Sequence, residues 1–373
     1  MNMNHADPIR MFLCGDVMTG RGIDQILPHP GDPALYESYV RDAREYVRLA
    51  EIAHGPIPRP VDFTYIWGDA LGEMERAGTD VRIINLETAV TESEGYWPDK
   101  PVLYRMRPRN IGCLTAAHVS CCALANNHLL DWGDEGLKET LRTLDAASIA
   151  HAGAGRDAAE ASSPAALDVA GKGRALVFSL GSPTSGVPSE WAATGGRPGV
   201  NLLEDLSGET ARRVAERMLK ETRSRDIVVA SIHWGANWGY RVSDEQISFA
   251  HRLIDEGVSI VHGHSSHHVK TIEVYRQRLI LYGCGDFLSD YEGITGYEQF
   301  RGDLTLMYLV EVDPRQGQLL KARLVPMQVR RLRLNRASAE DSQWLCDLLN
   351  RLGAPFETRA QLESDYSLTL HPV

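Results

Sequence analysis

The sequence predicts an α/β domain, and three observations carry this prediction. Five short apolar runs are each followed by polar residues, as buried strands leading into loops would be; they lie at 10–14, 81–84, 120–125, 227–232 and 258–261. Amphipathic stretches of helical length lie between them, at 67–77, 135–147, 207–222 and 243–256. This alternation predicts a sheet with helices on its faces. From Thr271 the sequence becomes β-rich, which predicts antiparallel strands at 271–275, 278–282, 304–312 and 320–329.

The remaining elements complete one domain over 1–373. Ser207 and Ser243 begin the last two amphipathic stretches, and an acidic residue follows each within three positions, which is typical of a helix N-terminus. A further helix is expected at 339–352, followed by a short polar tail. The Pro-rich stretch at 28–60 has the character of an insertion and contains a helical segment at 36–52. We therefore expect a core over 10–310, with C-terminal strands and a helix in 311–373.

Composition narrows the classes of partner. The net charge of −11 argues against nucleic acid, because phosphate contacts require a basic surface. The six cysteines lack the spaced pairs of a zinc knuckle, so we expect buried reduced thiols. The first nine residues lack the basic and apolar regions of a secretory signal, and no window approaches the ~20 apolar residues that cross a bilayer. We therefore expect a cytoplasmic protein with no membrane partner.

Side chains that can bind a metal ion or move a proton gather just after the apolar runs. They are Asp16, Glu87, Asn127, His128, His233, His264 and His267. One histidine after a strand is more often structural, but ligand-capable residues after all five predicted strands favour a functional site. Ligands of α/β folds bind beyond the carboxyl ends of the strands, and His and carboxylate groups suit both metal ligation and acid–base chemistry. The sequence therefore predicts one metal-assisted catalytic site.

Ordered motifs around these residues resemble those of a known family. The motifs are Gly15–Gly22 (GDVMTGRG), Asn85–Glu87 (NLE), Ala125–Gly133 (ANNHLLDWG), His233–Gly235 (HWG), Gly263–His267 (GHSSH), Glu273 and Leu281–Phe287 (LYGCGDF). Together they resemble CapA-type proteins, the poly-γ-glutamate capsule-synthesis family, over roughly residues 10–310. The resemblance implies a calcineurin-like metallophosphatase fold, which is a two-sheet β-sandwich flanked by helices with the site at one edge.

The chain departs from the family pattern at three places. Met18 stands where the first motif of a working metallophosphatase carries a His ligand, and Ser265-Ser266 precedes His267 where the family has His-Pro-His. Asp286 replaces the Asn of the closing Gly-Asn-Phe, which adds a carboxylate. Fewer nitrogen and more oxygen ligands favour one hard divalent cation, Ca²⁺ or Mg²⁺, over Zn, Mn or Fe.

Carried over by position, the resemblance implies a role for each residue. The implied metal ligands are Asp16, Glu87, Asn127, His233 and His264, and the implied catalytic groups are Asp16, His128, His264 and His267. Asp286, which departs from the family pattern, is a further candidate catalytic carboxylate. Two further residues are candidate substrate contacts. Arg105 either grips a substrate carboxylate or lies on a solvated loop, and Trp234 either lines a pocket or packs in the core.

Three functions remain open, all with a peptide or poly-amino-acid substrate or partner. The first is acid–base chemistry on a peptide, specifically epimerisation at the Cα of a C-terminal residue, since lasso-peptide epimerases are CapA-like proteins similar to this chain in lacking an anchor. The second is phosphoester or other hydrolysis, which an intact Asp-x-His would favour. The third is a poly-γ-glutamate synthesis factor, which an anchor or signal would favour. We choose the first because it accounts for the absence both of an intact Asp-x-His motif and of an anchor or signal.

Overall fold

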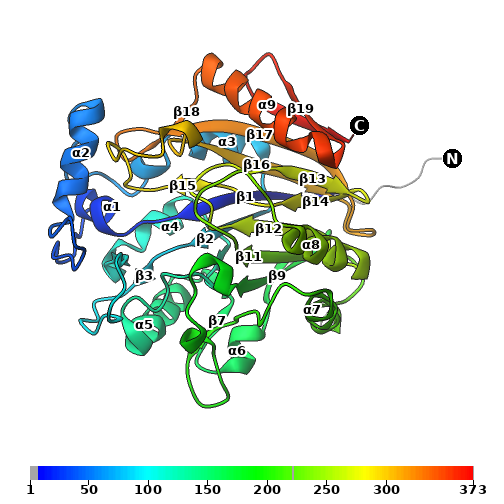
Figure 1. Cartoon of the computed structure of the whole chain (residues 1–373), viewed down its shortest axis with the longest axis horizontal. Helices are drawn as coiled ribbons and strands as arrows, with labels where there is room; N and C mark the ends of the chain where they lie inside the picture. The colour runs from blue at the N-terminus through cyan, green and yellow to red at the C-terminus, as the bar shows by residue number, and fades with distance from the viewer. Residues whose placement is uncertain (1–6, 221, 373) are drawn as a thin grey trace.

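The computed structural model describes residues 7–220 and 222–372 and contains two large β-sheets with helices around them (Figure 1). The first six residues, which carried part of the expectation about a signal, lie outside the described residues, as do Glu221 and Val373. In the described part of the chain, no helix is long and apolar enough to cross a bilayer.

The ten-stranded sheet is built around β1 (Ile9–Val17). On one side of β1 the strands run parallel to it: β2 (Val81–Leu86), β5 (Cys121–Ala123) and β6 (Ala150–Ala152). On the other side they are antiparallel neighbours: β16 (Leu304–Val312), β17 (Leu319–Val329), β18 (Leu334–Arg336), β19 (Thr358–Leu362) and β20 (Leu368–Pro372). The short strand β15 (Asp286–Leu288) pairs with the end of β1 in parallel.

The six-stranded sheet has four parallel strands and an antiparallel strand at each edge. The parallel strands are β9 (Gly173–Gly181), β11 (Asp226–His233), β12 (Ile260–His264) and β14 (Arg278–Leu281), and the edges are β8 (Ala165–Val169) and β13 (Ile272–Tyr275). Alternate side chains of a strand point to opposite faces. Leu13 and Ile83 of the first sheet therefore meet Val177 and Val229 of the second in one apolar core between the sheets.

Helices cover the outer faces of both sheets. The first sheet carries α3 (Asp69–Ala77), α4 (Gly112–Ala116) and α5 (Gly133–Ala146), and the second carries α7 (Gly208–Lys220) and α8 (Asp244–Glu256). Figure 1 shows α7 and α8 at the right of the molecule, with α1 (Arg21–Ile26) and α2 (Arg44–His54) at the left. The helix α9 (Ala339–Gly353) packs against β19. The remaining short elements are β3 (Ala89–Val90), β4 (Arg105–Met106), α6 (Ala158–Ser162), β7 (Ala154–Gly155) and β10 (Gly199–Val200).

Most expected elements are found, with differences at their ends. Ser243 caps α8, because its side chain accepts a hydrogen bond from Gln246 N and Gln246 reaches back to the cap. The insertion is helical only from Arg44, not from Tyr36. The expected polar tail instead contains β19 and β20, whose pairing with each other and with β17 is a long-range contact that local polarity does not reveal. All six cysteines are buried and unpaired, as expected.

β1 also continues past its expected end at Cys14. A Cβ on Gly15 would lie 1.7 Å from the carbonyl oxygen of Gly285, so only glycine lets the two backbones approach this closely. That approach allows Asp16 N–H to donate to Gly285 O at 2.9 Å and sets Asp286 beside Asp16 in the sheet. The strand therefore carries Asp16 into the sheet itself rather than into a loop.

Candidate metal centre and active site

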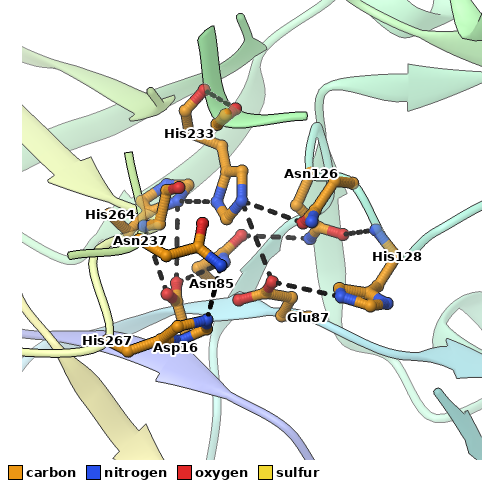
Figure 2. Close-up of polar contacts among 12 residues, drawn as sticks. Asp16, Asn85, Glu87, Asn126, His128, His233, Asn237, His264 and His267 are labelled. Carbon is orange, nitrogen blue, oxygen red and sulfur yellow. Dashed lines mark hydrogen bonds and ion pairs between the residues drawn. The ribbon is translucent and has the colours of Figure 1, made fainter. Parts of the chain in front are cut away.

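The sequence-predicted side chains meet at the carboxyl ends of the parallel strands of both sheets (Figure 2). Asp16 lies near the end of β1 and Glu87 directly follows β2, while Asn127 and His128 lie in the loop after β5. The last residues of β11 and β12 are His233 and His264, which are register partners. His267 lies on the loop after β12, and Asp286 begins β15.

The innermost members are Asp16, His233 and His264, whose ligand atoms lie within 4.8 Å of one another. The two Nδ1 atoms of His233 and His264 are 2.8 Å apart, and His264 Nδ1 is 3.8 Å from Asp16 Oδ1. His233 Nε2 lies 3.0 Å from Asn127 Oδ1. All three innermost side chains are buried. Lone pairs of nitrogen and oxygen therefore converge on one small volume.

Glu87 provides the test of whether this set fits a metal ion. Its Oε1 atom lies 3.7 Å from His128 Nε2 and 3.8 Å from His233 Nε2. Its Oε2 atom is buried and has no hydrogen-bond partner among the described residues. A buried, ionised carboxylate oxygen without a partner is strongly unfavourable, and either a proton shared with the Asp16 carboxyl or a divalent cation removes this cost. The set fits such a cation with three oxygen and two nitrogen donors: Asp16, Glu87, Asn127, His233 and His264.

The electrostatics agree with that fit. Burial, together with the charge of Asp286, raises the pKa of Asp16 to about 7. Burial and the charge of Asp16 raise the pKa of Glu87 well above its ordinary value. Burial lowers the pKa of both His233 and His264, which keeps the imidazoles neutral and able to ligate. Without a cation the carboxyl groups are held toward their protonated forms, so metal binding would release protons.

One histidine–carboxylate pair borders this cluster at the loop after β12. His267 Nδ1 lies 2.8 Å from Asp286 Oδ1, and its Nε2 lies 3.0 Å from Asn237 Nδ2. Burial disfavours a charge on His267, but Asp286 and Asp16 outweigh burial and raise its pKa. Of the two bordering histidines, His267 is therefore the one whose protonated form is favoured.

A second pair borders the cluster at the loop after β5. His128 Nδ1 lies 2.7 Å from Asp131 Oδ2, and the Lys100 ammonium lies 2.9 Å from the same nitrogen while forming an ion pair with Asp131. Burial and the nearby Lys100 charge lower the pKa of His128 to about 4. His128 is therefore neutral at physiological pH and can accept a proton.

Further residues that the sequence did not single out orient the ligands. Asn85 donates to Asp16 Oδ1 at 2.7 Å, and the Ser265 N–H donates to Asp16 Oδ2 at 3.1 Å. Ser231 Oγ lies 2.9 Å from His264 Nε2. Such partners hold metal ligands in place and tune their basicity. Asn85 stands in the same motif as Glu87, so motif position could have found it, whereas the loop residue Lys100 carries no such signal.

The two candidate substrate contacts lie elsewhere. The Trp234 ring is buried against Phe249 and Tyr282, and its Nε1–H donates to Tyr282 O at 3.1 Å. Of the two alternatives for Trp234, a pocket wall or packing in the core, the structure shows core packing, because Trp234 directly follows β11 and points to the face opposite His233. Arg105 lies over the Trp132 ring at 3.8 Å and borders a separate cavity of about 240 Å³ that also includes Arg21. The cavity of about 160 Å³ beside Glu87, His128 and His267 does not include Arg105.

Fold and site together define a two-sheet α/β protein with a buried His–carboxylate cluster suited to one divalent cation. The chain belongs to the bacterial capsule synthesis protein family PGA_cap, whose family model matches residues 10–291. This confirms the CapA-type family expected from the motifs.

Curated relatives and a solved structure are similar to it to different degrees. A probable polyglutamine synthesis accessory protein of Mycobacterium tuberculosis is 48% identical over 369 residues, covering 99% of this chain and 97% of the relative. The capsule biosynthesis protein CapA of Bacillus anthracis is 24% identical and covers 76% of this chain and 60% of its own. The PGA biosynthesis protein CapA of Bacillus subtilis is 25% identical, with 76% and 64% covered. A crystal structure of a Thermus thermophilus protein covers 87% of this chain and 100% of its own at 10% identity with a TM-score of 0.36, which is too low to assign a fold.

Proposed function

We propose that this chain is a metal-dependent enzyme that acts on a peptide-like chain during synthesis of a glutamate-type polymer. The buried, unpartnered Oε2 atom of Glu87 carries the metal-dependent part of this proposal. The polymer comes from the relatives, which are named for polyglutamine synthesis and capsule biosynthesis. Two packed sheets with the cluster at their carboxyl ends support assignment to the calcineurin-like metallophosphatase fold.

The residues divide into those that hold the cation and those that move protons. Asp16, Glu87, Asn127, His233 and His264 would hold a divalent cation, which when bound supplies a Lewis acid for a substrate carbonyl or phosphoryl oxygen. In the flanking pairs, a carboxylate lies against Nδ1 of His128 and of His267, which orients each ring. Nε2 is therefore the atom of each ring left to exchange a proton with substrate, which at His267 requires that the substrate displace the Asn237 amide that donates to Nε2. His267 starts as the acid and His128 as the base, in keeping with their opposite pKa shifts.

Metal binding is the direct test. Calorimetric titration of the chelator-treated protein with Mg²⁺, Ca²⁺, Mn²⁺ and Zn²⁺ should find one site, with Mg²⁺ or Ca²⁺ bound at physiological concentrations. Glu87→Gln should weaken binding by at least about tenfold, as losses around metal ligands do. Glu273→Gln is the matched control, because Glu273 is a buried carboxylate whose oxygens already contact His251 and Tyr282. Two tightly held Zn ions per chain, or equal loss in both variants, would contradict the proposal.

Epimerisation at a Cα is a second candidate, and the placement of the two pairs favours it. Figure 2 shows His128 and His267 on either side of Glu87. Inversion of a Cα needs a proton removed on one face and returned on the other, with an electrophile to stabilise the enolate-like carbanion between them. Two imidazoles with opposite pKa shifts on either side of a metal site meet that need. Deprotonation of the substrate by His128 and reprotonation by His267 leave the atoms in balance.

Deuterium incorporation separates the candidate reactions. A peptide or γ-glutamyl oligomer incubated in D₂O with the metal-loaded protein should gain deuterium at one Cα if the enzyme epimerises. His128→Asn and His267→Asn should each lower that rate by roughly 10²-fold or more, as loss of a general acid or base does. Release of phosphate or of shortened peptide without deuterium at Cα would identify a hydrolase instead.

A further inference from the structure

A second and larger cavity adjoins the one at the metal cluster. It measures about 510 Å³, against about 160 Å³ for the cavity beside Glu87, and both are bordered by Asn237, His267 and Tyr291. The larger volume falls in the range of about 300–1,000 Å³ that is usual for small-molecule sites. A substrate bound across the shared residues would place one group in the larger cavity while its reacting atom lies at His267.

The lining of the larger cavity is rich in aromatic and aliphatic side chains. In the described chain, eight large hydrophobic side chains are exposed, and three of them border this cavity: Tyr39, Ile294 and Tyr297. Trp238 also borders it and stacks on Tyr297 with ring centroids 4.0 Å apart. Exposed apolar side chains that cluster in one concave region often mark a binding site. The lining therefore favours an apolar guest.

The charges of this cavity disfavour an anionic guest. Three of its lining side chains can be cationic, and each is already against a carboxylate. Arg301 donates to both Asp303 and Asp341, at 2.8 Å in each case, while His54 lies 2.7 Å from Glu292. His267 is held by Asp286. A glutamate side chain placed here would meet four lining carboxylates, Asp286, Glu292, Glu298 and Asp303, and no unshared cation among the lining residues.

We propose that this cavity binds an uncharged aromatic side chain of the substrate, next to the atom on which His267 acts. Aromatic rings gain more than their buried area from stacking on other rings, and Tyr297 and Tyr39 offer exposed rings for that purpose. The substrate is then a peptide-like chain of that polymer synthesis which carries an aromatic residue at or beside the reacting position, rather than one built from glutamate alone. The role of His267 in this statement rests on the proposed function, whereas the binding of an aromatic group does not.

Saturation-transfer NMR and calorimetry with two small probes test this specificity. N-acetyl-tryptophanamide should bind the wild-type protein, and a γ-linked triglutamate should not compete with it. Tyr297→Ala should weaken binding of the aromatic probe by roughly tenfold, the size of effect that loss of an aromatic partner produces. Tyr366→Ala is the matched control, because Tyr366 is 47% exposed against 48% for Tyr297 but does not border the cavity. Tyr366→Ala should bind the probe as the wild type does.

The same binding experiment on a metal-site variant distinguishes the aromatic site from the proposed function. Glu87→Gln with chelator present should bind the aromatic probe as the wild type does, even if metal binding or catalysis fails. No binding of the probe, equal binding by Tyr297→Ala and wild type, or displacement of the probe by triglutamate would each overturn the aromatic site. Loss of probe binding in Glu87→Gln would likewise overturn it, since the probe would then occupy the metal cavity.

Discussion

Two buried clusters of charged side chains lie at the carboxyl end of β1. They differ in whether all of their polar atoms have hydrogen-bond partners. In the Arg21 cluster, formed by Arg21, Glu37, Tyr46 and Asp290, all three guanidinium nitrogens have partners. Nε and Nη2 donate to Asp290, and Nη1 donates to Glu37 at 2.9 Å and to Tyr46 at 3.0 Å. The guanidinium also lies 3.9 Å from the Tyr46 ring centroid. The cluster contains its own cation and needs no ligand.

The metal cluster gathers carboxylates with no cation of its own at its centre. Asp16 receives hydrogen bonds from Asn85 and the Ser265 backbone, but Glu87 Oε2 is left without a partner among the described residues. The nearest ammonium, Lys100, is engaged with Asp131. Buried polar groups in native proteins are nearly always satisfied, so an exception marks either strain or a missing ligand. The comparison supports the proposal that the metal cluster binds a cation, and it predicts that the Arg21 cluster stabilises the fold instead.

The largest effect is expected from breaking the Arg21 cluster. Arg21→Met leaves Asp290 and Glu37 buried without their cation, and loss of one partner of a buried ion pair typically costs about 3–5 kcal/mol of unfolding free energy. Urea denaturation measures this loss. Arg212→Met is the control, since Arg212 forms surface ion pairs with Glu209 and Glu216 that solvent screens, and it should lose far less unfolding free energy than Arg21→Met. If the two variants lost similar amounts of unfolding free energy, the Arg21 cluster would contribute no more to stability than a surface ion pair.

A smaller and oppositely directed effect is expected at the metal cluster. Because Glu87 Oε2 lacks a partner among the described residues, Glu87→Gln should leave the stability of the chelated protein unchanged or raise it. Wild-type protein should gain about 2.7 kcal/mol when the cation is present at 100 times its dissociation constant, and a variant that binds tenfold or more weakly should gain no more than about 1.4 kcal/mol. Urea denaturation with and without the cation checks both statements. A large loss of stability in chelated Glu87→Gln would place Glu87 among the residues that stabilise the fold.

The smallest effect concerns pH, at a histidine in neither cluster. Burial lowers the pKa of His268 to about 4 from its ordinary value near 6.5, and its Nε2 accepts a hydrogen bond from Gly239 N–H at 3.1 Å. Between pH 6.5 and 4 the unfolded chain binds a proton here that the folded chain does not, so stability falls as the pH falls through this window. His268→Gln should reduce the loss between pH 7 and 5 by about 2 kcal/mol, measured by urea denaturation with chelator. An unchanged pH dependence would show that His268 does not contribute to it.

The sequence predicted where the strands that carry the site lie, although not their exact ends, because the apolar runs that mark these strands are local. Apolar runs mark β1, β2, β5, β11 and β12, and ligating residues follow each of them. The same period-two pattern could have corrected the interpretation of Trp234. Val228, Ala230, Ile232 and Trp234 alternate along one face of β11, and that face packs under the helices. Trp234 therefore belongs to the core because it is one residue out of phase with His233.

By itself, the sequence determined the family, the α/β alternation and the residue types that stand at the strand ends, because each is encoded in short runs of neighbouring residues. Only the tertiary structure decided which of those side chains have partners. Arg21 and Asp290 are 269 positions apart, and Glu87 reaches His233 from a different sheet. Hydrogen bonding and desolvation act over a few ångströms in space and are indifferent to separation along the chain. The Arg21 cluster therefore becomes fully hydrogen-bonded, and Glu87 Oε2 is left without a partner among the described residues, only when the two sheets pack.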